Sequence, residues 1–333
     1  MIELSVIIPT RNRSEILSKA LDALTLQTFS KNKFEVIVVD NGSTDNTKDV
    51  VETYRQQIPN LIYVYDETPG LHVGRHQGFK RAQSDILVYA DDDSFGFPTW
   101  LETVYVTFQD KDTVLVGGKD LPQYESEPPF WILEKWYRLC EYGHCMPELS
   151  LIDFGDEIKE IPPYYVFGCN FAIRKNIVEQ AGGFHPDGMP FELIRYRGDG
   201  ETYVSKYIET HGLKTIYNPK SSIYHLVPTT RMTIDYFKKR AFCQGVEMSY
   251  SDLRYGRTNP PAAKRGSRLK RYLKLLMGIE CVNRIDELSA KLSLTEIDKQ
   301  IEQSKQTGYN YHRNMYQKDE ALKAWVHKEN YWE

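Results

Sequence analysis

The sequence predicts an α/β protein, with a mostly parallel β-sheet flanked by helices and a helical C-terminal extension. Over the first 90 residues, short runs rich in β-branched residues alternate with longer segments of helical periodicity. Aspartate-rich clusters follow the second and the fourth of these runs, and beyond residue 256 the chain is polar with scattered apolar positions. Strands that alternate with helices are typical of a parallel sheet wound by right-handed crossovers.

The elements of this sheet follow one another in a regular order. Strands are expected at residues 4–8, 35–39, 61–65 and 86–90, where the runs are LSVII, EVIVV, LIYVY and ILVYA. A first helix is expected behind Ser14 as its N-cap, since apolar residues recur at positions 17, 20, 21 and 24. A second helix is expected around positions 50 to 54, behind Ser43 and Thr44 as cap candidates.

Two polar clusters lie where a parallel sheet binds its ligands. Open sheets of this kind take ligands beyond the carboxyl ends of their strands. The cluster VVDNGSTDNT follows the second expected strand, and DDD follows the fourth. We therefore expect both clusters to line one crevice.

Composition and charge exclude several classes of protein. The 333 residues, 41% of them hydrophobic, suit a globular chain of about two domains. A formal net charge of -4 gives no drive toward nucleic acid, so no nucleic-acid partner is expected. Five cysteines without a C-x-x-C pair predict reduced thiols. The N-terminus lacks a secretory signal pattern, and no apolar run approaches the roughly 18 residues of a membrane span, so we expect a cytoplasmic protein.

The stretch VYADDDSF, residues 88–95, places three carboxylates directly after an apolar strand. In extended backbone the side chains alternate, so Asp91 and Asp93 point one way and Asp92 points the other. Two carboxylates on one side suit a hard divalent cation that also holds substrate phosphates. A solvated turn is the alternative for three acids taken alone.

The common nucleotide-binding motifs are missing from the sequence. The turn after the first strand reads PTRNR, without the G-x-G-x-x-G of a dinucleotide site, and no G-x-x-x-x-G-K-[ST] occurs. A nicotinamide oxidoreductase and a P-loop NTPase are therefore not expected.

Five blocks of sequence resemble the family 2 glycosyltransferases of the GT-A fold. They lie in the family's order over roughly the first 230 residues and read SVIIPTRNR (5–13), VVDNGSTDNT (38–47), GRHQGFKRAQSDILVYADDDS (74–94), FGCNFAIRKNIVEQAGGF (167–184) and RGDGETYVSKYIETHG (197–212). The five together are far more specific than any one of them. The resemblance implies a Rossmann-like GT-A domain at 1–255, with a nucleotide-binding half (1–95) and an acceptor half (96–255). The helical extension is then 256–333.

Carried over residue by residue, the resemblance also implies a set of site residues. The donor-binding residues would be Pro9, Thr10, Arg11, Asp40, Arg75, Asp91 and Asp92, and the metal ligands would be Asp93 and His225. Asp40 would read the uracil edge, because an ionised carboxylate accepts a hydrogen bond from an imide N–H. Its alternative is an Asx-turn within DNGSTD. Arg231 would also face the donor diphosphate.

The catalytic base stays open between two acids. Many members of the family show Gly-Glu-Asp followed by another acid, and the Asp is the base, whereas Gly200 interrupts that run here. The preceding glycine favours Asp199 as the base, and the spacing to Gly212 favours Glu201. We favour Asp199 on local motif order and keep both.

The implied activity is transfer of a sugar from a nucleotide-diphosphate donor, a UDP-sugar first, to an acceptor hydroxyl with inversion. A divalent cation, Mn²⁺ or Mg²⁺, would neutralise the departing diphosphate, and one carboxylate would take the acceptor proton. The acceptor would be a saccharide or a lipid-linked saccharide in polysaccharide or glycoconjugate synthesis. The alternatives are a non-catalytic carbohydrate-binding or scaffold protein of the same fold, and a metal-dependent phosphohydrolase.

A basic cluster lies in the C-terminal extension. Six basic residues and no acid occur between positions 264 and 274, namely Lys264, Arg265, Arg268, Lys270, Arg271 and Lys274. Such a cluster suits peripheral contact with an anionic membrane, at about 1 kcal/mol for each basic residue near the surface. We favour the interpretation that this basic cluster is a solvated helix face.

Overall fold

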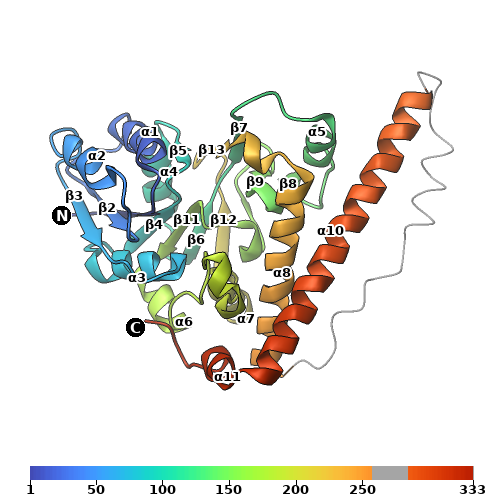
Figure 1. The fold of residues 1–333 in the computed structure, drawn as a ribbon. Coiled ribbons are helices and arrows are strands. Elements are labelled where there is room, and N and C mark those ends of the chain that lie inside the picture. The colour runs from blue at the N-terminus through green and yellow to red at the C-terminus, as the bar shows by residue number, and fades with distance from the viewer. Residues whose placement is uncertain (257–283, 333) are drawn as a thin grey trace. The chain divides into compact units, whose positions relative to one another are not determined.

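The computed structural model describes residues 1–256 and 284–332 (Figure 1). The basic cluster and Cys281 lie outside the described residues. The chain divides into two compact units, one made of Met1–Thr233 with Lys328–Glu333 and the other of Ile234–His327. This division falls at Thr233, whereas the sequence suggested a boundary after residue 255. Among the described residues, none of the helices is both long and apolar enough to cross a membrane.

The first unit is built on an eight-stranded mixed sheet. In sheet order its strands are β10 (Lys159–Glu160), β12 (Lys214–Tyr217), β6 (Thr113–Gly117), β11 (Asn170–Arg174), β4 (Ile86–Ala90), β1 (Leu4–Thr10), β2 (Phe34–Asp40) and β3 (Leu61–Tyr65). The four strands from β4 to β3 are parallel, as the sequence predicts. Strand β11 runs antiparallel to both β4 and β6. The carboxyl ends of β1, β2 and β4 therefore meet at one edge.

A second sheet of five strands lies in the same unit. Its order is β5 (Ser94–Gly96), β13 (Ile223–Val227), β7 (Asp120–Tyr124), β9 (Leu151–Asp153) and β8 (His144–Met146). Strand β13 pairs antiparallel with β5, so that His225 lies opposite Ser94. This pairing brings a residue far along the chain beside the end of the aspartate cluster.

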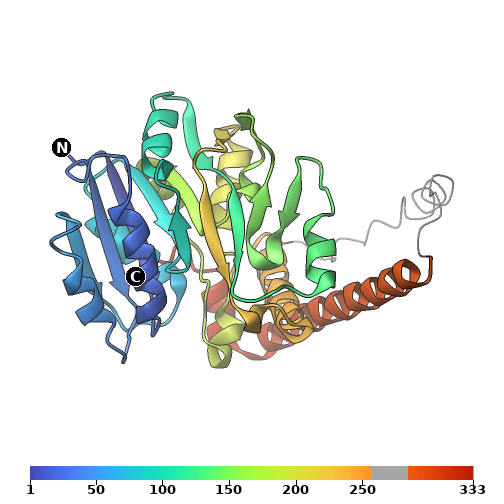
Figure 2. The same ribbon diagram turned by 90° about the horizontal axis from the view of Figure 1, so that it is seen from above.

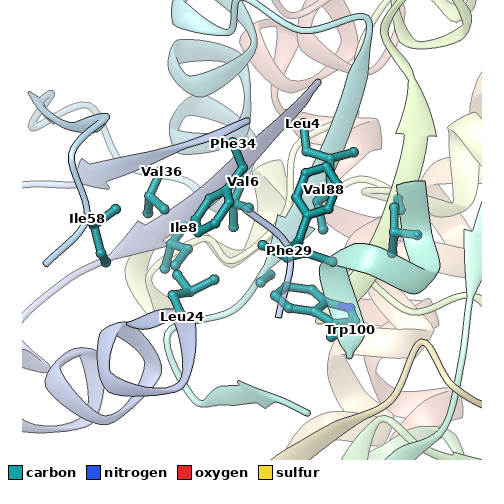
Figure 3. Close-up of a cluster of buried hydrophobic side chains, with 14 of the residues drawn as sticks. Leu4, Val6, Ile8, Leu24, Phe29, Phe34, Val36, Ile58, Val88 and Trp100 are labelled. Carbon is teal, nitrogen blue, oxygen red and sulfur yellow. The ribbon is translucent and has the colours of Figure 1, made fainter. Parts of the chain in front are cut away.

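Helices cover both faces of the large sheet. They are α1 (Ser14–Thr25), α2 (Thr47–Thr53), α3 (Leu71–Arg81), α4 (Trp100–Thr107), α6 (Lys175–Ala181) and α7 (Thr202–Thr210). Helix α5 (Phe130–Trp136) instead contacts β8 of the second sheet. Alternate residues of β1 lie in opposite cores. Leu4, Val6 and Ile8 belong to the core that also contains residues of α1, α2 and α4, and Ile7 belongs to the core that also contains residues of α6 and α7. Figure 3 shows the first of these cores, with Phe29 and Trp100 against the strand residues. Both faces of the sheet are thus buried, as expected for parallel strands.

Glycines set the distance between α3 and the sheet. A Cβ built on Gly78 would lie 2.2 Å from Ile7 Cγ2, and one on Gly74 would lie 2.8 Å from Pro9 Cβ. Only a residue without a side chain lets the helix backbone approach β1 so closely. Arg75 follows Gly74 directly, so this approach places its side chain beside the carboxyl end of β1.

The predicted helix caps differ from the observed ones. Helix α1 begins at Ser14 itself, whose hydroxyl donates to Asn46 Oδ1 at 2.6 Å, and α2 begins at Thr47. The expected cap Ser43 instead accepts a hydrogen bond from the backbone N–H of Asn12 at 2.8 Å. Thr44 donates its own N–H to Asn12 Oδ1 at 2.7 Å. These side chains therefore join the loops after β1 and β2 to each other.

The second unit is a helical hairpin. In its described residues the helices are α8 (Ile234–Arg254), α10 (Arg284–Lys318) and α11 (Glu320–Val326), and Figures 1 and 2 show α8 and α10 side by side. The two helices approach closely at glycines: a Cβ on Gly245 would lie 1.9 Å from Lys305 O, and one on Gly308 would lie 2.0 Å from Phe242 O. The expected helical character of the extension is confirmed for its described residues.

Candidate functional site

The three aspartates lie at the carboxyl end of β4, where the chain turns. The N–H of Ser94 donates to Asp91 O at 3.1 Å, so Asp91–Ser94 form a turn rather than extended backbone. Asp92 and Asp93 are buried, and Asp91 is partly exposed. Ligand atoms of Asp91, Asp93 and His225 all lie within 4.8 Å of one another. The carboxylates of Asp91 and Asp93 thus converge as the sequence predicts, although the backbone reaches that arrangement by turning.

The donor set of this cluster suits a divalent cation. His225 Nδ1 lies 2.9 Å from the carbonyl of Leu149 and so carries the proton there. Its other ring nitrogen, Nε2, faces Asp93 Oδ1 at 3.2 Å. A carbonyl that fixes the tautomer of an imidazole is the usual support for a metal-binding histidine. Two carboxylates and one imidazole would accept Mg²⁺ or Mn²⁺.

Basic side chains surround the aspartates. Arg13 donates to Asp92 Oδ1 and, at 2.8 Å, to Asp93 Oδ2, and Arg231 Nη2 lies 3.0 Å from the same Asp93 oxygen. The family resemblance implied that Arg231 faces the diphosphate, but it did not single out Arg13. The available signal for Arg13 was its place in PTRNR, just beyond a strand that the sheet sets next to β4.

The carboxyl pKa values in the cluster differ according to their partners. Burial raises the pKa of Asp91, against the charge of Arg75. Burial also raises the pKa of Asp92 to about 7, although Arg13 opposes that shift. For Asp93 burial acts in the same direction, but His225, Arg231 and Arg13 outweigh it and hold the pKa well below its usual range. Asp93 is therefore the carboxylate that stays ionised most firmly.

An ion pair connects α3 to the start of α7. Arg75 Nη1 donates to Glu201 Oε2 at 2.8 Å, and its Nη2 lies 4.0 Å from Asp91 Oδ1. The guanidinium is almost fully buried, and a Cβ on Gly168 would lie 2.1 Å from Nη2, so Gly168 leaves the room for it. Burial works against the charge of Arg75, yet Glu201 and Asp91 outweigh it and raise its pKa. The Arg75 guanidinium therefore contacts both Glu201 and Asp91, which is one of the metal-ligand candidates.

The second candidate base, Asp199, has a different environment. Its side chain is buried, and its Oδ1 lies 2.5 Å from His185 Nδ1. The His185 ring stacks on Tyr203 with centroids 3.6 Å apart. Gly200, at φ +52°, separates the two acids with a left-handed residue. The choice between Asp199 and Glu201 stays open on these contacts: Glu201 pairs with Arg75, and Asp199 contacts His185.

The predicted nucleotide pocket lies along the ends of β1 and β2. Pro9 and Thr10 are buried, Thr10 Oγ1 donates to Asp92 Oδ2 at 2.7 Å, and Arg11 is exposed. Asp40 accepts the backbone N–H of Ser43 at 2.7 Å and the hydroxyl of Tyr63 at 2.6 Å. The Asx-turn alternative is therefore present. Because each carboxylate oxygen can accept a second hydrogen bond, contact with a base stays a prediction.

Comparison with known proteins identifies relatives over most of the chain. The family model described as Glycosyl transferase family 2 matches residues 5–182, more than half of the sequence. The glucosyl-dolichyl phosphate glucuronosyltransferase of Haloferax volcanii is 24% identical over 306 residues, which cover 90% of this chain and 91% of that relative.

Solved structures share the fold. The mannosyltransferase PcManGT of Pyrobaculum calidifontis, in complex with GDP-Man and Mn²⁺, has a TM-score of 0.57 at 18% identity and covers 96% of this chain and 88% of its own. S. aureus TarS 1-349 in complex with UDP-GlcNAc has a TM-score of 0.51 at 15% identity, with coverages of 95% and 92%. At such identities the likeness concerns the fold alone. The expected GT-A type fold is confirmed.

Proposed function

The chain belongs to glycosyl transferase family 2, and on that premise we propose that it moves a sugar from a nucleotide-diphosphate donor to an acceptor hydroxyl with inversion. The protein is a glycosyltransferase. The donor, the cation and the residues that carry the reaction are the parts that we propose. Our first choice of donor is a UDP-sugar, and a GDP-sugar is the competing choice because neighbours of this fold carry one or the other.

One observation carries the proposal. The ligand atoms of Asp91, Asp93 and His225 converge within 4.8 Å at the carboxyl end of β4, beside the ion pair of the buried Arg75 with Glu201. Crevices at the carboxyl ends of parallel strands are where such sheets bind ligands. A cation ligand set, two phosphate-pairing arginines and a carboxylate base in one place are the parts that sugar transfer from a nucleotide diphosphate requires.

We assign the divalent cation to Asp93 and His225, with Asp91 as the third ligand. When bound there, a cation would stabilise negative charge on the leaving diphosphate as a Lewis acid. Arg231 and Arg13 would hold the same group by charge-assisted hydrogen bonds. Thr10 would fix Asp92 through its 2.7 Å hydrogen bond, which keeps the aspartate turn in shape.

We assign the base to Glu201. Its carboxylate is about one-quarter exposed and pairs with Arg75, so it has both access to an acceptor hydroxyl and a fixed orientation. Its exposure allows the proton that it takes to be released. The buried Asp199 is hydrogen-bonded to His185, which suits support of the loop better than proton transfer. Inversion in a single displacement needs one base and no covalent sugar-enzyme intermediate.

We propose a saccharide or a lipid-linked saccharide as the acceptor. The relative from Haloferax volcanii that spans most of the chain is named for a glucosyl-dolichyl phosphate, which is a lipid-linked sugar. This favours the lipid-linked class. Peripheral membrane contact through the basic cluster stays a prediction, because those residues lie outside the described part of the chain.

A donor screen tests the proposed function. The protein is incubated with a panel of UDP- and GDP-sugars, with Mn²⁺ or Mg²⁺ and with a lipid-linked saccharide, and the released nucleotide is identified. Release of UDP or GDP that depends on acceptor and cation is the expected result. Release of inorganic phosphate instead would indicate a phosphohydrolase, and no turnover with any pair would favour a non-catalytic binding protein.

A further inference from the structure

Residues near the end of the chain are part of the first unit. The segment Lys328–Glu333 belongs to the unit formed by Met1–Thr233, nearly 100 residues away along the chain. Tyr331 is only 2% exposed. Figure 1 shows the C-terminal segment, in red, ending beside α3 and α6. The contacts that bury this segment are those of the Tyr331 and Trp332 rings with histidine imidazoles.

Trp332 packs on the face of α3 that carries His76 and Phe79. The centroid of its ring lies 4.4 Å from that of His76 and 4.7 Å from that of Phe79. Lys80 Nζ donates to the carbonyl of Trp332 at 2.9 Å. A Cβ on Gly183 would lie 3.0 Å from the indole, and Gly183 has a φ of +86°, so this position accommodates the tryptophan only as glycine. These contacts lie within about one turn of α3 and fix it from one side.

Tyr331 joins α3 to the loop before α7. Its ring meets His72 edge-on, with centroids 6.4 Å apart, and His185 edge-on at 5.3 Å. His185 is in turn bonded to Asp199 and stacked on Tyr203 at the start of α7. The two aromatic residues therefore contact both elements that meet at the ion pair of the proposed site.

Arg75 lies on α3 between the two imidazoles that these rings contact. His72 precedes it by three residues and His76 follows it directly. The Arg75 guanidinium, Phe184 and Glu201 lie close together, with 5.3 Å to the Phe184 ring and 2.8 Å to Glu201 Oε2. The backbone N–H of Phe184 donates to His76 Nε2 at 2.8 Å. A small shift of α3 would therefore change the direction of Arg75 and its distance to Glu201.

We propose that Tyr331 and Trp332 are positioning residues for sugar transfer. They pack against α3 and the loop before α7, and this packing keeps Arg75 in contact with Glu201. The inference rests on the proposed function for what Arg75 and Glu201 do. The packing itself does not depend on it. Neither residue touches the reacting atoms, and both act through the imidazoles between them and the ion pair.

The test compares Trp332→Ala and Trp332→Phe in the full chain, with Trp325→Ala as the matched tryptophan control in the other unit. Transfer is measured well below the temperature at which any variant unfolds, and hydrogen exchange is followed in residues 71–81. We expect Trp332→Ala to lower kcat/KM for the donor about tenfold, within the range of energetic coupling between packed residues. Exchange of the α3 amides should rise in the same variant. Trp332→Phe should recover most of both, and Trp325→Ala should change neither.

A second variant covers the case in which Trp332→Ala does not fold. Lys80→Gln removes the charged donor to the Trp332 carbonyl at an exposed position, and we expect about a threefold lower kcat/KM with faster exchange in α3. Wild-type transfer and wild-type exchange in a folded Trp332→Ala protein, or in Lys80→Gln, would overturn the inference. Failure of the wild-type protein with every donor would instead refute the proposed function, while the exchange comparison would still decide whether the rings hold α3.

Discussion

Replacing Glu201 and Asp199 by their amides separates proton abstraction from support of the loop. Glu201→Gln keeps the size of the side chain and an oxygen that accepts the hydrogen bond from Arg75, now at 2.8 Å, but the amide cannot take a proton. Asp199→Asn likewise keeps its shape, yet it removes the charge that faces His185 at 2.5 Å in a buried position. The two variants should therefore fail in different ways.

The expected magnitudes follow from those environments. Loss of a general base lowers turnover by roughly 10²- to 10⁴-fold, so Glu201→Gln should lose about 3 to 5 kcal/mol of transition-state stabilisation. Glu201→Gln also removes the charge that offsets the burial of Arg75, so its unfolding free energy should fall by about 1.5 to 3 kcal/mol. Asp199→Asn weakens a buried hydrogen bond and should cost about 1 to 3 kcal/mol of stability. Its turnover, measured while folded, should fall less than tenfold.

The assay measures three quantities for each variant: transfer at saturating donor and acceptor, donor affinity by calorimetry, and unfolding by denaturant. Near-normal donor affinity in Glu201→Gln would show that the site is intact. An active Glu201→Gln together with an inactive, stable Asp199→Asn would return the base to Asp199. Activity in both variants would place the base outside this loop.

Three further predictions concern the cation, the pH dependence and the packing of α3. Asp93→Asn should weaken Mn²⁺ binding, followed by electron paramagnetic resonance, at least tenfold, because Asp93 is the most firmly ionised ligand candidate. Burial lowers the pKa of His72 to about 4 and that of His76 to about 3. Below the ordinary histidine pKa of about 6.5, the unfolded chain therefore binds protons on these imidazoles that the folded protein does not bind. Unfolding free energy should thus fall as pH drops from 7 to 5, by roughly 2 kcal/mol for each imidazole, in denaturant titrations. Gly78→Ala should destabilise the protein by about 1 to 3 kcal/mol in the same assay, since its Cβ would lie 2.2 Å from Ile7 Cγ2.

Each of these has a control and a contrary outcome. Asp92→Asn, which alters a neighbouring carboxylate, should affect Mn²⁺ binding less, and equal effects would remove the ligand assignment. Removing one imidazole with His76→Gln should reduce the pH dependence by about half, and an unchanged slope would place the linkage in other groups. Arg81→Ala serves as the exposed control on α3. Alanine is the better helix former by about 1 kcal/mol, so a stabilised Gly78→Ala protein would show that α3 can move.

The sequence predicted the parallel half of the fold closely. Strands β3 and β4 have the predicted bounds, and β1 and β2 extend the predicted runs by one or two residues at their ends. Strands buried on both faces give a continuous apolar run, which is a strong local signal. The caps were harder, because Ser43 and Thr44 bond to Asn12 across two loops, and a contact between distant segments leaves no local pattern.

The site was predicted only in part, because some of its contacts also join segments that are distant in the sequence. The convergence of Asp91 and Asp93 followed from their spacing, and His225 from the resemblance. Arg13 was missed because its contact with Asp93 depends on β1 lying beside β4, which the sheet order determines. The aromatic residues near the end of the chain gave no sequence signal, since nothing in a short polar stretch indicates that it packs on α3.

A structure with Mn²⁺ and a nucleotide diphosphate would test the proposed cation site directly. We expect an anomalous manganese peak in contact with Asp93 and His225, with the diphosphate bound to the metal and to Arg231. A manganese peak away from this cluster, or a diphosphate bound where no carboxylate of the aspartate turn reaches its cation, would contradict it.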